Sequence, residues 1–180
     1  MHRLQTKYNK EILPNLFKKF DYKNPFAAPK LQKVVINIGA GQNLKDAKFA
    51  EMLEKNITAI SGQKPLKTAA KKSISNFKIR EGMIIGMKVT LRDRRMFDFL
   101  DKLVNVTLPR IRDFRGLPPT CMDKQGNLTI GFKDQIPFSE IAAEGTEKLH
   151  GIEVTIVSKA RNKEEAFELY KLLGFPFRTK

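Results

Sequence analysis

The distribution of apolar residues along the chain predicts four helices and five strands. Apolar side chains recur about every fourth position in four stretches, which is the spacing of one helix face. Shorter stretches rich in β-branched residues, most of them alternating between apolar and polar positions, predict strands. The predicted helices cover residues 3–20, 46–61, 93–108 and 162–173, and the predicted strands cover 33–39, 65–70, 84–92, 127–132 and 152–157.

The order of these elements predicts an α+β fold. We expect a mostly antiparallel sheet with helices packed on one face and the other face open. An open polar sheet face is the surface that several RNA-recognition domains use. The sequence has no internal repeat, low-complexity tract or clear domain boundary. We therefore expect a single domain over residues 1–180, with an N-terminal helix at 3–20 and a basic loop at 71–83.

The strand at 84–92 has the clearest alternation of side chains. Its apolar set consists of Ile85, Met87, Val89 and Leu91, and its polar set consists of Gly86, Lys88, Thr90 and Arg92. At ~3.3 Å per residue, the polar set spreads two cations, a hydroxyl and a bare stretch of backbone over a surface about 20 Å long. On the strand at 33–39, Asn37 lies opposite the apolar set, which suits either a contact surface or simple hydration.

Several residues at the helix ends have capping or helix-breaking chemistry. Asp46 and Asp93 are suited to cap the second and third helices. Asn162 with Glu165 forms a capping pattern for the last helix. Pro14 lacks a backbone N–H and should kink or split the first helix. The third helix should bury Met96, Phe97, Leu100, Val104 and Leu108.

Positive charge is concentrated in one part of the chain. The sequence has 34 Lys and Arg against 19 Asp and Glu, a formal net charge of +15, and a pI near 10.0. Between Ser61 and Arg95, ten basic residues stand against Glu81 and Asp93, so this segment alone carries +8. Its Ser, Thr, Asn and Gln side chains can donate hydrogen bonds to phosphates and bases. The segment predicts a polyanionic partner; the alternative is a solvated lysine face.

The stretch from Lys71 to Gly82 predicts a long, flexible basic loop. Long loops in compact domains are usually functional or disordered. A basic loop with one aromatic residue can contact phosphates and stack on a base or ribose; alternatively, Phe77 packs back into the core. Around Phe77 stand Lys71, Lys72, Ser73, Ser75, Asn76, Lys78 and Arg80.

Composition argues against several other classes of protein. No apolar run approaches the roughly 20 residues needed to span a bilayer, and no apolar core of a signal peptide follows Met1. The lone Cys121 excludes an internal disulfide and fits a reducing cytosol. His2 and His150 are isolated, so we expect no zinc site, no cofactor and no small-molecule substrate. We expect a cytoplasmic protein without a membrane partner.

Two alternatives remain open from the residues alone. A metal-dependent nuclease would need clustered carboxylates, and two sets could supply them: Asp98 with Asp101, and Glu140, Glu144 and Glu147. Both sets lie outside the basic segment and suit a solvated surface better, so we expect no enzyme. A general single- or double-stranded nucleic-acid-binding module would share the basic segment. A helix reading duplex DNA would need polar side chains after Arg94 and Arg95, where core residues stand instead.

Four segments carry a resemblance to a known family. They are Ile57–Ser73 (ITAISGQKPLKTAAKKS), Ile85–Arg92 (IGMKVTLR), Leu108–Gly116 (LPRIRDFRG) and Leu172–Phe177 (LLGFPF). In this order, and spread over nearly the whole chain, they resemble the large-subunit ribosomal protein five family, which binds 5S rRNA in the central protuberance. The resemblance implies a structural constituent of the large ribosomal subunit that attaches 5S rRNA to it.

The resemblance also implies which residues contact RNA. In the family a concave sheet lies on 5S rRNA. Asn37, Gln63 and Thr90 match its polar contact positions. The basic and hydroxyl residues around them would contact phosphates: Lys33, Lys64, Lys67, Thr68, Lys71, Lys72, Lys88 and Arg92.

Two further contacts are implied by the same resemblance. The loop matches the family's mobile loop, which approaches peptidyl-site tRNA and large-subunit rRNA, through Ser75, Asn76, Phe77, Lys78, Ile79, Arg80, Glu81 and Gly82. A second basic segment matches the side that meets protein thirteen of the small-subunit head, in an inter-subunit bridge, through Arg110, Arg112, Asp113, Phe114 and Arg115. Other 5S-associated ribosomal proteins are further implied partners.

Overall fold

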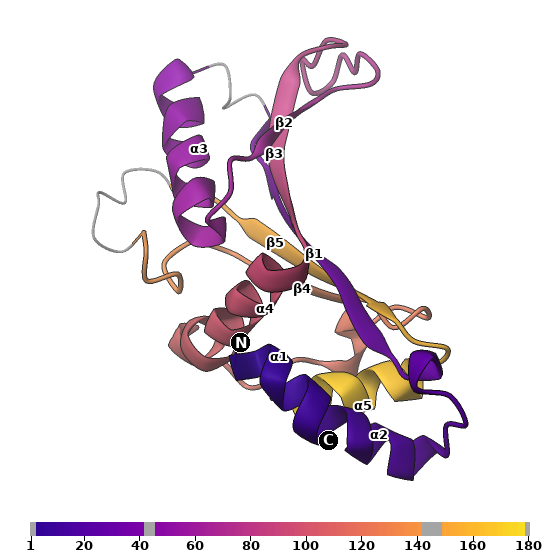
Figure 1. Ribbon diagram of the computed structural model, residues 1–180. Coiled ribbons are helices and arrows are strands. Elements are labelled where there is room, and N and C mark those ends of the chain that lie inside the picture. Colours follow the sequence, from indigo (N-terminus) through magenta and orange to yellow (C-terminus); the bar gives the residue numbers. More distant parts are fainter. Residues whose placement is uncertain (1–2, 42–45, 142–148, 179–180) are drawn as a thin grey trace. The chain divides into compact units, whose positions relative to one another are not determined.

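The computed structural model describes residues 3–41, 46–141 and 149–178. Its elements follow the predicted order, and the fold is of the α+β class (Figure 1). The helices are α1 (Arg3–Lys7), α2 (Leu13–Phe20), α3 (Ala47–Ser61), α4 (Asp93–Lys102) and α5 (Lys163–Leu173). The strands are β1 (Lys30–Gly39), β2 (Leu66–Ala69), β3 (Ile84–Leu91), β4 (Leu128–Phe132) and β5 (Ile152–Lys159).

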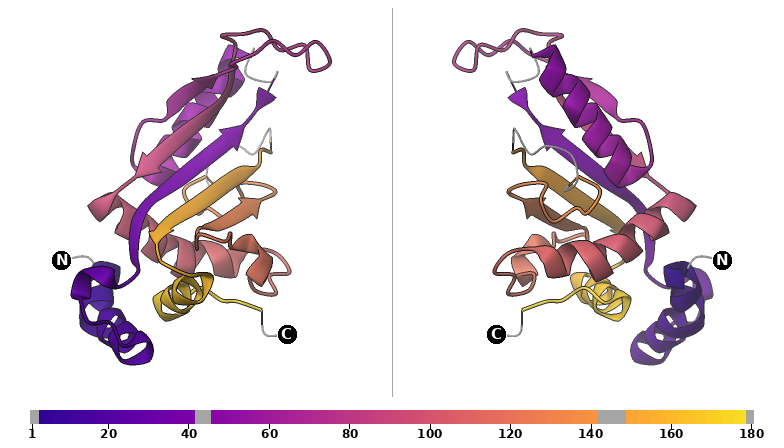
Figure 2. Two further views of the ribbon diagram at one scale, coloured as in Figure 1. Left: turned by 90° about the vertical axis from the view of Figure 1, so that its right-hand side faces the viewer. Right: turned by 90° about the vertical axis from the view of Figure 1, so that its left-hand side faces the viewer.

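The five strands form one open sheet in the order β2-β3-β1-β5-β4. Neighbouring strands run antiparallel, as the alternating arrowheads in Figure 2 show. Alternate side chains are buried along the long strands, as in Val34, Ile36 and Ile38 of β1 and Ile152, Val154 and Ile156 of β5. The side chains between them stay exposed or half buried. The predicted antiparallel sheet with one open face is therefore confirmed.

The backbone divides into two compact units, and each is described by itself. Unit 1 comprises Met1–Val34, Leu91–Ile130 and Thr155–Lys180, and unit 2 comprises Val35–Thr90 and Gly131–Val154. In unit 1 the N-terminal helix packs against α4 and α5. In unit 2, α3 lies along one side of β2 and β3 (Figures 1 and 2) and buries Phe49, Leu53, Ile57 and Ile60. Asp46 caps α3 as predicted, since its carboxylate accepts from the backbone N–H of Lys48 at 3.1 Å.

The N-terminal helix contains a widened turn just before Pro14. Residues Tyr8–Ile12 form a π-helix, in which the N–H of Leu13 donates to the carbonyl of Tyr8, five residues back. α2 then begins with Pro14 in its first turn. Proline has no N–H to donate to the preceding turn and its ring crowds that turn, so a widened turn just before it is the expected accommodation. The predicted kink or split takes the form of this π turn between α1 and α2.

One predicted cap is wrong, and another is right in its position but lacks the predicted hydrogen bonds. At α4, Arg92 occupies the N-cap position without a side-chain hydrogen bond, and Asp93 has a positive φ of 48°. At α5, Asn162 is the N-cap but its side chain makes no cap bond. Glu165 instead accepts from the backbone N–H of Arg161 at 3.1 Å, one residue before the predicted partner.

The buried face of α4 also differs from the prediction. Phe97 and Val104 are only half buried. Buried residues follow Met96 at the i+3, i+4 and i+7 positions. A π turn at Leu103–Thr107 comes next, and its last residue is also buried. The fully buried residues of this stretch are Met96, Phe99, Leu100, Leu103, Thr107 and Leu108.

Candidate nucleic-acid interface

The polar face of β3 is exposed where the alternation predicts it. Met87, Val89 and Leu91 are buried, whereas Lys88 is exposed and Thr90 is half exposed. Gly86 is the exception, because it is buried. A Cβ on Gly86 would lie 2.7 Å from the carbonyl oxygen of Ile38 and 2.9 Å from Oγ1 of Thr68. The expected bare stretch of backbone is therefore covered, and the prediction of an open spot at Gly86 is wrong.

The register of β2 on β3 determines which β2 side chains share the open face. Leu66 is opposite Lys88, Lys67 is opposite Met87, and Thr68 is opposite Gly86. Residues directly opposite each other in an antiparallel pair project from the same face. Leu66 and Thr68 therefore lie on the open face with Lys88, and Lys67 lies on the face of the buried Met87. The side chain of Leu66 is 63% exposed there.

Lys67 and Lys64 both pair with a carboxylate that sequence reasoning missed. Their ammonium groups lie 3.3 Å and 3.4 Å from the two carboxylate oxygens of Glu54 on α3. The hydrogen bond from Lys67, with a further contribution from Lys64, holds the pKa of Glu54 below its usual range. Two of the proposed phosphate-binding lysines thus have an internal anionic partner. In the sequence Glu54 is one more polar residue on the outer face of a helix.

Two of the predicted polar contact residues also have partners. Nδ2 of Asn37 on β1 donates to Oε2 of Glu153 on the neighbouring β5, at 3.3 Å. Nε2 of Gln63 lies 3.5 Å from the backbone oxygen of Thr90. Both contacts lie within unit 2. The amide of Gln63 is therefore close to the strand that carries Lys88 and Thr90.

Most of the predicted rRNA-binding residues belong to unit 2. Lys33 and Arg92 belong to unit 1, where Lys33 is half buried and Arg92 is exposed. Lys71 and Lys72 follow β2 and are exposed at the start of the loop. Those in unit 2 are Asn37, Gln63, Lys64, Lys67, Thr68, Lys71, Lys72, Lys88 and Thr90.

The basic loop between β2 and β3 is a hydrogen-bonded hairpin, which the sequence did not predict. Ile74 and Ile79 exchange both backbone hydrogen bonds, at 2.9 Å and 3.1 Å. At the base of the hairpin, Ala70 pairs with Met83 at 2.8 Å and with Gly82 at 3.0 Å. The hairpin projects beyond the ends of β2 and β3 in Figure 1.

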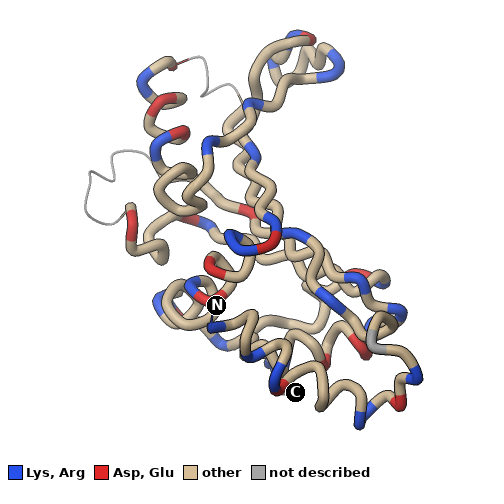
Figure 3. The backbone as a smooth tube through the Cα atoms, in the orientation of Figure 1, with Lys and Arg blue, Asp and Glu red and all other residues tan. Residues whose placement is uncertain are grey.

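Phe77 is displayed at the tip of this hairpin. Its side chain is 63% exposed, so the alternative that it packs back into the core is wrong. The next residue, Lys78, adopts a left-handed backbone with φ of 50°. In Figure 3 the hairpin carries more basic than acidic positions. A shallow hollow on it is lined by Ser73, Ser75, Lys78, Ile79, Arg80 and Met83.

The second basic segment lies in unit 1. Arg110, Arg112, Asp113 and Arg115 are exposed, and Phe114 is half buried. Arg112 and Asp113 are 3.9 Å apart and almost fully exposed, a geometry that contributes little to stability. After this segment, the N–H of Leu117 donates to the carbonyl of Pro176 at 2.8 Å, and the N–H of Arg178 donates back to Leu117 at 3.0 Å.

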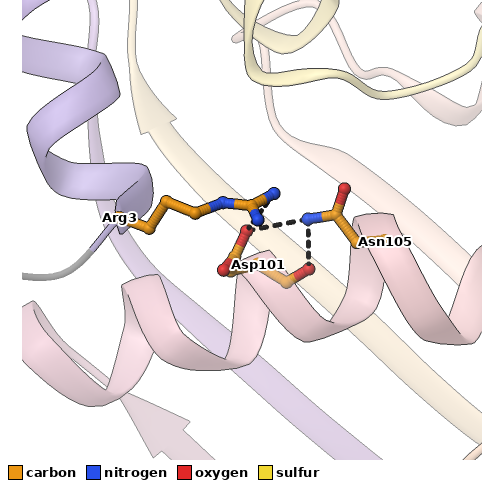
Figure 4. A network of polar contacts seen from close by, with 3 residues as sticks. All are labelled: Arg3, Asp101 and Asn105. Carbon is orange, nitrogen blue, oxygen red and sulfur yellow. Dashed lines mark hydrogen bonds and ion pairs between the residues drawn. The ribbon is translucent and has the colours of Figure 1, made fainter.

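Among the residues that the structure describes, the carboxylates considered for a nuclease do not gather into a metal site. Asp101 lies 3.7 Å from Arg3, and Asn105 donates to its side-chain oxygen at 2.7 Å and to its backbone oxygen at 2.8 Å (Figure 4). This network links the N-terminal helix to α4 within unit 1. Within residues 3–41, 46–141 and 149–178, no three potential metal ligands cluster. Of the second acidic set, Glu144 and Glu147 lie outside the described residues. Burial raises the pKa of the Cys121 thiol, which makes it a weak nucleophile.

Fold and site together define an α+β protein with an open, lysine-bearing sheet face and a projecting basic hairpin, the architecture of a sheet-based RNA-binding protein. Two family profiles match the chain: "Ribosomal protein L5" over residues 24–80, and the profile for the C-terminus of the same ribosomal family over residues 84–177. The chain belongs to the ribosomal protein L5 family. The resemblance carried by the four sequence segments is thereby confirmed.

Curated relatives match almost the whole chain. A protein named large ribosomal subunit protein uL5 from Halothermothrix orenii is 52% identical over 177 residues, which cover 98% of this chain and 99% of the relative. The protein of the same name from Caldanaerobacter subterraneus subsp. tengcongensis is 51% identical over 177 residues, with the same coverage. That from Limosilactobacillus fermentum is 50% identical over 176 residues, 98% of each chain.

Membership in this family decides between the classes considered from the sequence. The family consists of ribosomal proteins and not of enzymes, so the chain is not a metal-dependent nuclease. Among the helices of the described ranges, none is both long enough and apolar enough to span a membrane.

Proposed function

We propose that this chain is a structural constituent of the large ribosomal subunit that binds 5S rRNA and attaches it in the central protuberance. The observation that carries the proposal is the composition of the open sheet face. On β3, Lys88 is exposed and Thr90, which projects from the same face, is half exposed. On β2, Thr68 projects from this face too, opposite Gly86 of β3. Among the described strand residues only Glu153 is a carboxylate. Such a surface favours a polyanion, because cations contact phosphates while hydroxyls and amides contact bases and ribose.

Within this proposal the contact residues divide into two groups. Asn37, Gln63 and Thr90 would contact bases or ribose, since their side chains offer donors and acceptors without net charge. The other group would neutralise phosphates and release counterions. It consists of Lys33, Lys64, Lys67, Lys71, Lys72, Lys88 and Arg92, with the Thr68 hydroxyl as an additional donor.

We also propose that the hairpin contacts peptidyl-site tRNA and large-subunit rRNA. The support is the exposed Phe77 with Lys78 and Arg80 close to it. An exposed aromatic ring among cations can stack on a base or ribose while the cations contact phosphates.

The exposed residues of the segment Arg110–Arg115 are the proposed contact with protein thirteen of the small-subunit head, in an inter-subunit bridge. Other 5S-associated ribosomal proteins are proposed neighbours, and residues 1–180 are proposed to act as one RNA-binding domain.

Recovery of RNA with the purified chain tests the proposal. Tagged protein is mixed with total cellular RNA at about physiological ionic strength, where weak surface attraction is largely screened, and the retained RNA is sequenced. The proposal predicts strong enrichment of 5S rRNA over tRNA and messenger RNA. A variant in which Lys88, Lys71 and Lys72 are all alanine should retain much less RNA of every kind. Retention in proportion to RNA abundance would indicate a general nucleic-acid-binding protein instead.

A further inference from the structure

The open face of the sheet contains one acidic side chain. Glu153 lies between the buried residues Ile152 and Val154 of β5, so its carboxylate projects from the open face. It is the only Asp or Glu in any strand of the described chain. A carboxylate on a surface that binds a polyanion weakens binding through repulsion. A second role of Glu153 that favours binding would offset this repulsion and explain its position.

The contact that Glu153 makes indicates that role. Asn37 lies between the buried Ile36 and Ile38 of β1, so its amide projects from the same face. Nδ2 of Asn37 lies 3.3 Å from Oε2 of Glu153. An asparagine amide has two nearly isosteric ends, an acceptor oxygen and a donor nitrogen. An ionised carboxylate only accepts hydrogen bonds, so it can pair only with the NH2 end.

We propose that Glu153 is a positioning residue that sets the orientation of the Asn37 amide for RNA recognition. The inference rests on the proposed function, because it assumes that Asn37 contacts RNA. With one N–H held by Glu153, the amide presents its oxygen and its second N–H in a fixed arrangement. A base edge offers a donor and an acceptor in a matching order, so a fixed amide discriminates where a rotating amide does not. The repulsion from one carboxylate is the cost of this orientation.

Three variants test the inference: Asn37→Ala, Glu153→Ala and Glu153→Gln, with the double Ala variant completing a cycle. The measurement is the ratio of dissociation constants for an unrelated structured RNA and for 5S rRNA, at one salt concentration. Asn37→Ala should lower this ratio about tenfold, in line with the loss of one good polar contact to a base. Glu153→Ala should lower it to within about threefold of that value, because the amide is then free to turn. Thermal unfolding of each variant checks that it is folded.

The Glu153→Gln variant separates orientation from charge. Gln keeps an acceptor oxygen but also has a donor end, so the pair can form in two ways and discrimination should fall by only about twofold. The double variant should discriminate no worse than Asn37→Ala alone, because Glu153 acts through Asn37.

Other outcomes would overturn the inference. Independent, additive losses would mean that Glu153 contacts RNA directly. Tighter binding of both RNAs by Glu153→Ala, with an unchanged ratio, would mean that only repulsion was relieved. An unchanged ratio for Asn37→Ala would remove Asn37 as a reading residue, and the inference with it. Absence of any preference for 5S rRNA in the unmodified chain would instead contradict the proposed function itself.

Discussion

Lys67 is directly opposite the buried Met87 in the β2–β3 ladder, so its side chain projects from the opposite face of the sheet to that of Lys88. Its ammonium group lies 3.3 Å from Glu54. β2 therefore contributes Thr68 and the exposed Leu66 to the open face, while Lys67 projects from the face that α3 covers. Of the lysines proposed to contact RNA, Lys88 therefore lies on the open face, whereas Lys64 and Lys67 are paired with Glu54.

The first prediction concerns the electrostatic part of RNA binding. Lys88→Ala should reduce the slope of log affinity against log salt concentration by roughly one, because one phosphate contact is lost. Binding of 5S rRNA and of unrelated RNA should weaken by similar factors. The matched control is Lys171→Ala, which removes an exposed lysine of α5 and should leave the slope unchanged. An unaltered slope for Lys88→Ala would remove this residue from the interface.

A second prediction concerns the lysine pair. Glu54→Gln removes the negative partner of Lys64 and Lys67, so both should become more available to phosphates. We expect 5S rRNA to bind about two- to fivefold more tightly, since an exposed ion pair is weak and competes only modestly with phosphate contacts. The gain should disappear when both lysines are alanine. If Glu54→Gln binds RNA as the unmodified chain does, the two lysines do not contact RNA. Filter binding at several salt concentrations measures both effects.

A third prediction concerns the close approach at Gly86. Gly86→Ala would place a Cβ 2.7 Å from the carbonyl oxygen of Ile38, a backbone atom that cannot move without shifting β1. Overpacking of this kind costs roughly 1–3 kcal/mol of stability. Gly39→Ala is the control, because no atom lies within 4 Å of the added Cβ. Chemical denaturation should show a loss for the first variant and little change for the second. Equal stabilities would contradict the described packing of β1 against β3.

A fourth prediction separates the hairpin from the sheet face. Phe77→Ala combined with Lys78→Gly should weaken binding of peptidyl-site tRNA to ribosomes and leave affinity for isolated 5S rRNA within about twofold. Glycine is chosen because Lys78 has a left-handed backbone, which an alanine would also strain. Loss of stacking on Phe77 should cost about 1–3 kcal/mol. Collapse of 5S binding in this variant would mean that the hairpin belongs to the 5S interface.

Part of this site could be predicted from the chain itself, and particular residues show where prediction stops. The alternation on β3 placed Lys88 and Thr90 outward correctly, because side chains on a strand alternate between faces. The sequence could not show from which face Lys67 of β2 projects, because a shift of the β2–β3 register by one residue would move its side chain to the other face. The sequence gives no signal for Glu54 or Glu153, because each pairs with a residue of another element. Asn37 and Glu153 are 116 positions apart.

The backbone contains features that side-chain patterns do not reveal. The close approach of Ile38 and Thr68 to Gly86 depends on how β1, β2 and β3 meet. The hairpin is closed by two backbone hydrogen bonds between Ile74 and Ile79, in a segment whose composition is typical of an open loop. The sequence likewise could not show that α4 buries Phe99 more deeply than Phe97, because the two residues are equally apolar. The packing of the helix decides which one is buried.

Chemical footprinting of lysines shows whether folded 5S rRNA lies on the open sheet face. The chain is acetylated briefly with and without 5S rRNA, and the modification of each lysine is measured by mass spectrometry. We predict that Lys88, Lys71 and Lys72 are protected by 5S rRNA, while Lys10 and Lys171 on the helices react as before. Protection of Lys10 and Lys171, with Lys88 still fully reactive, would contradict this prediction.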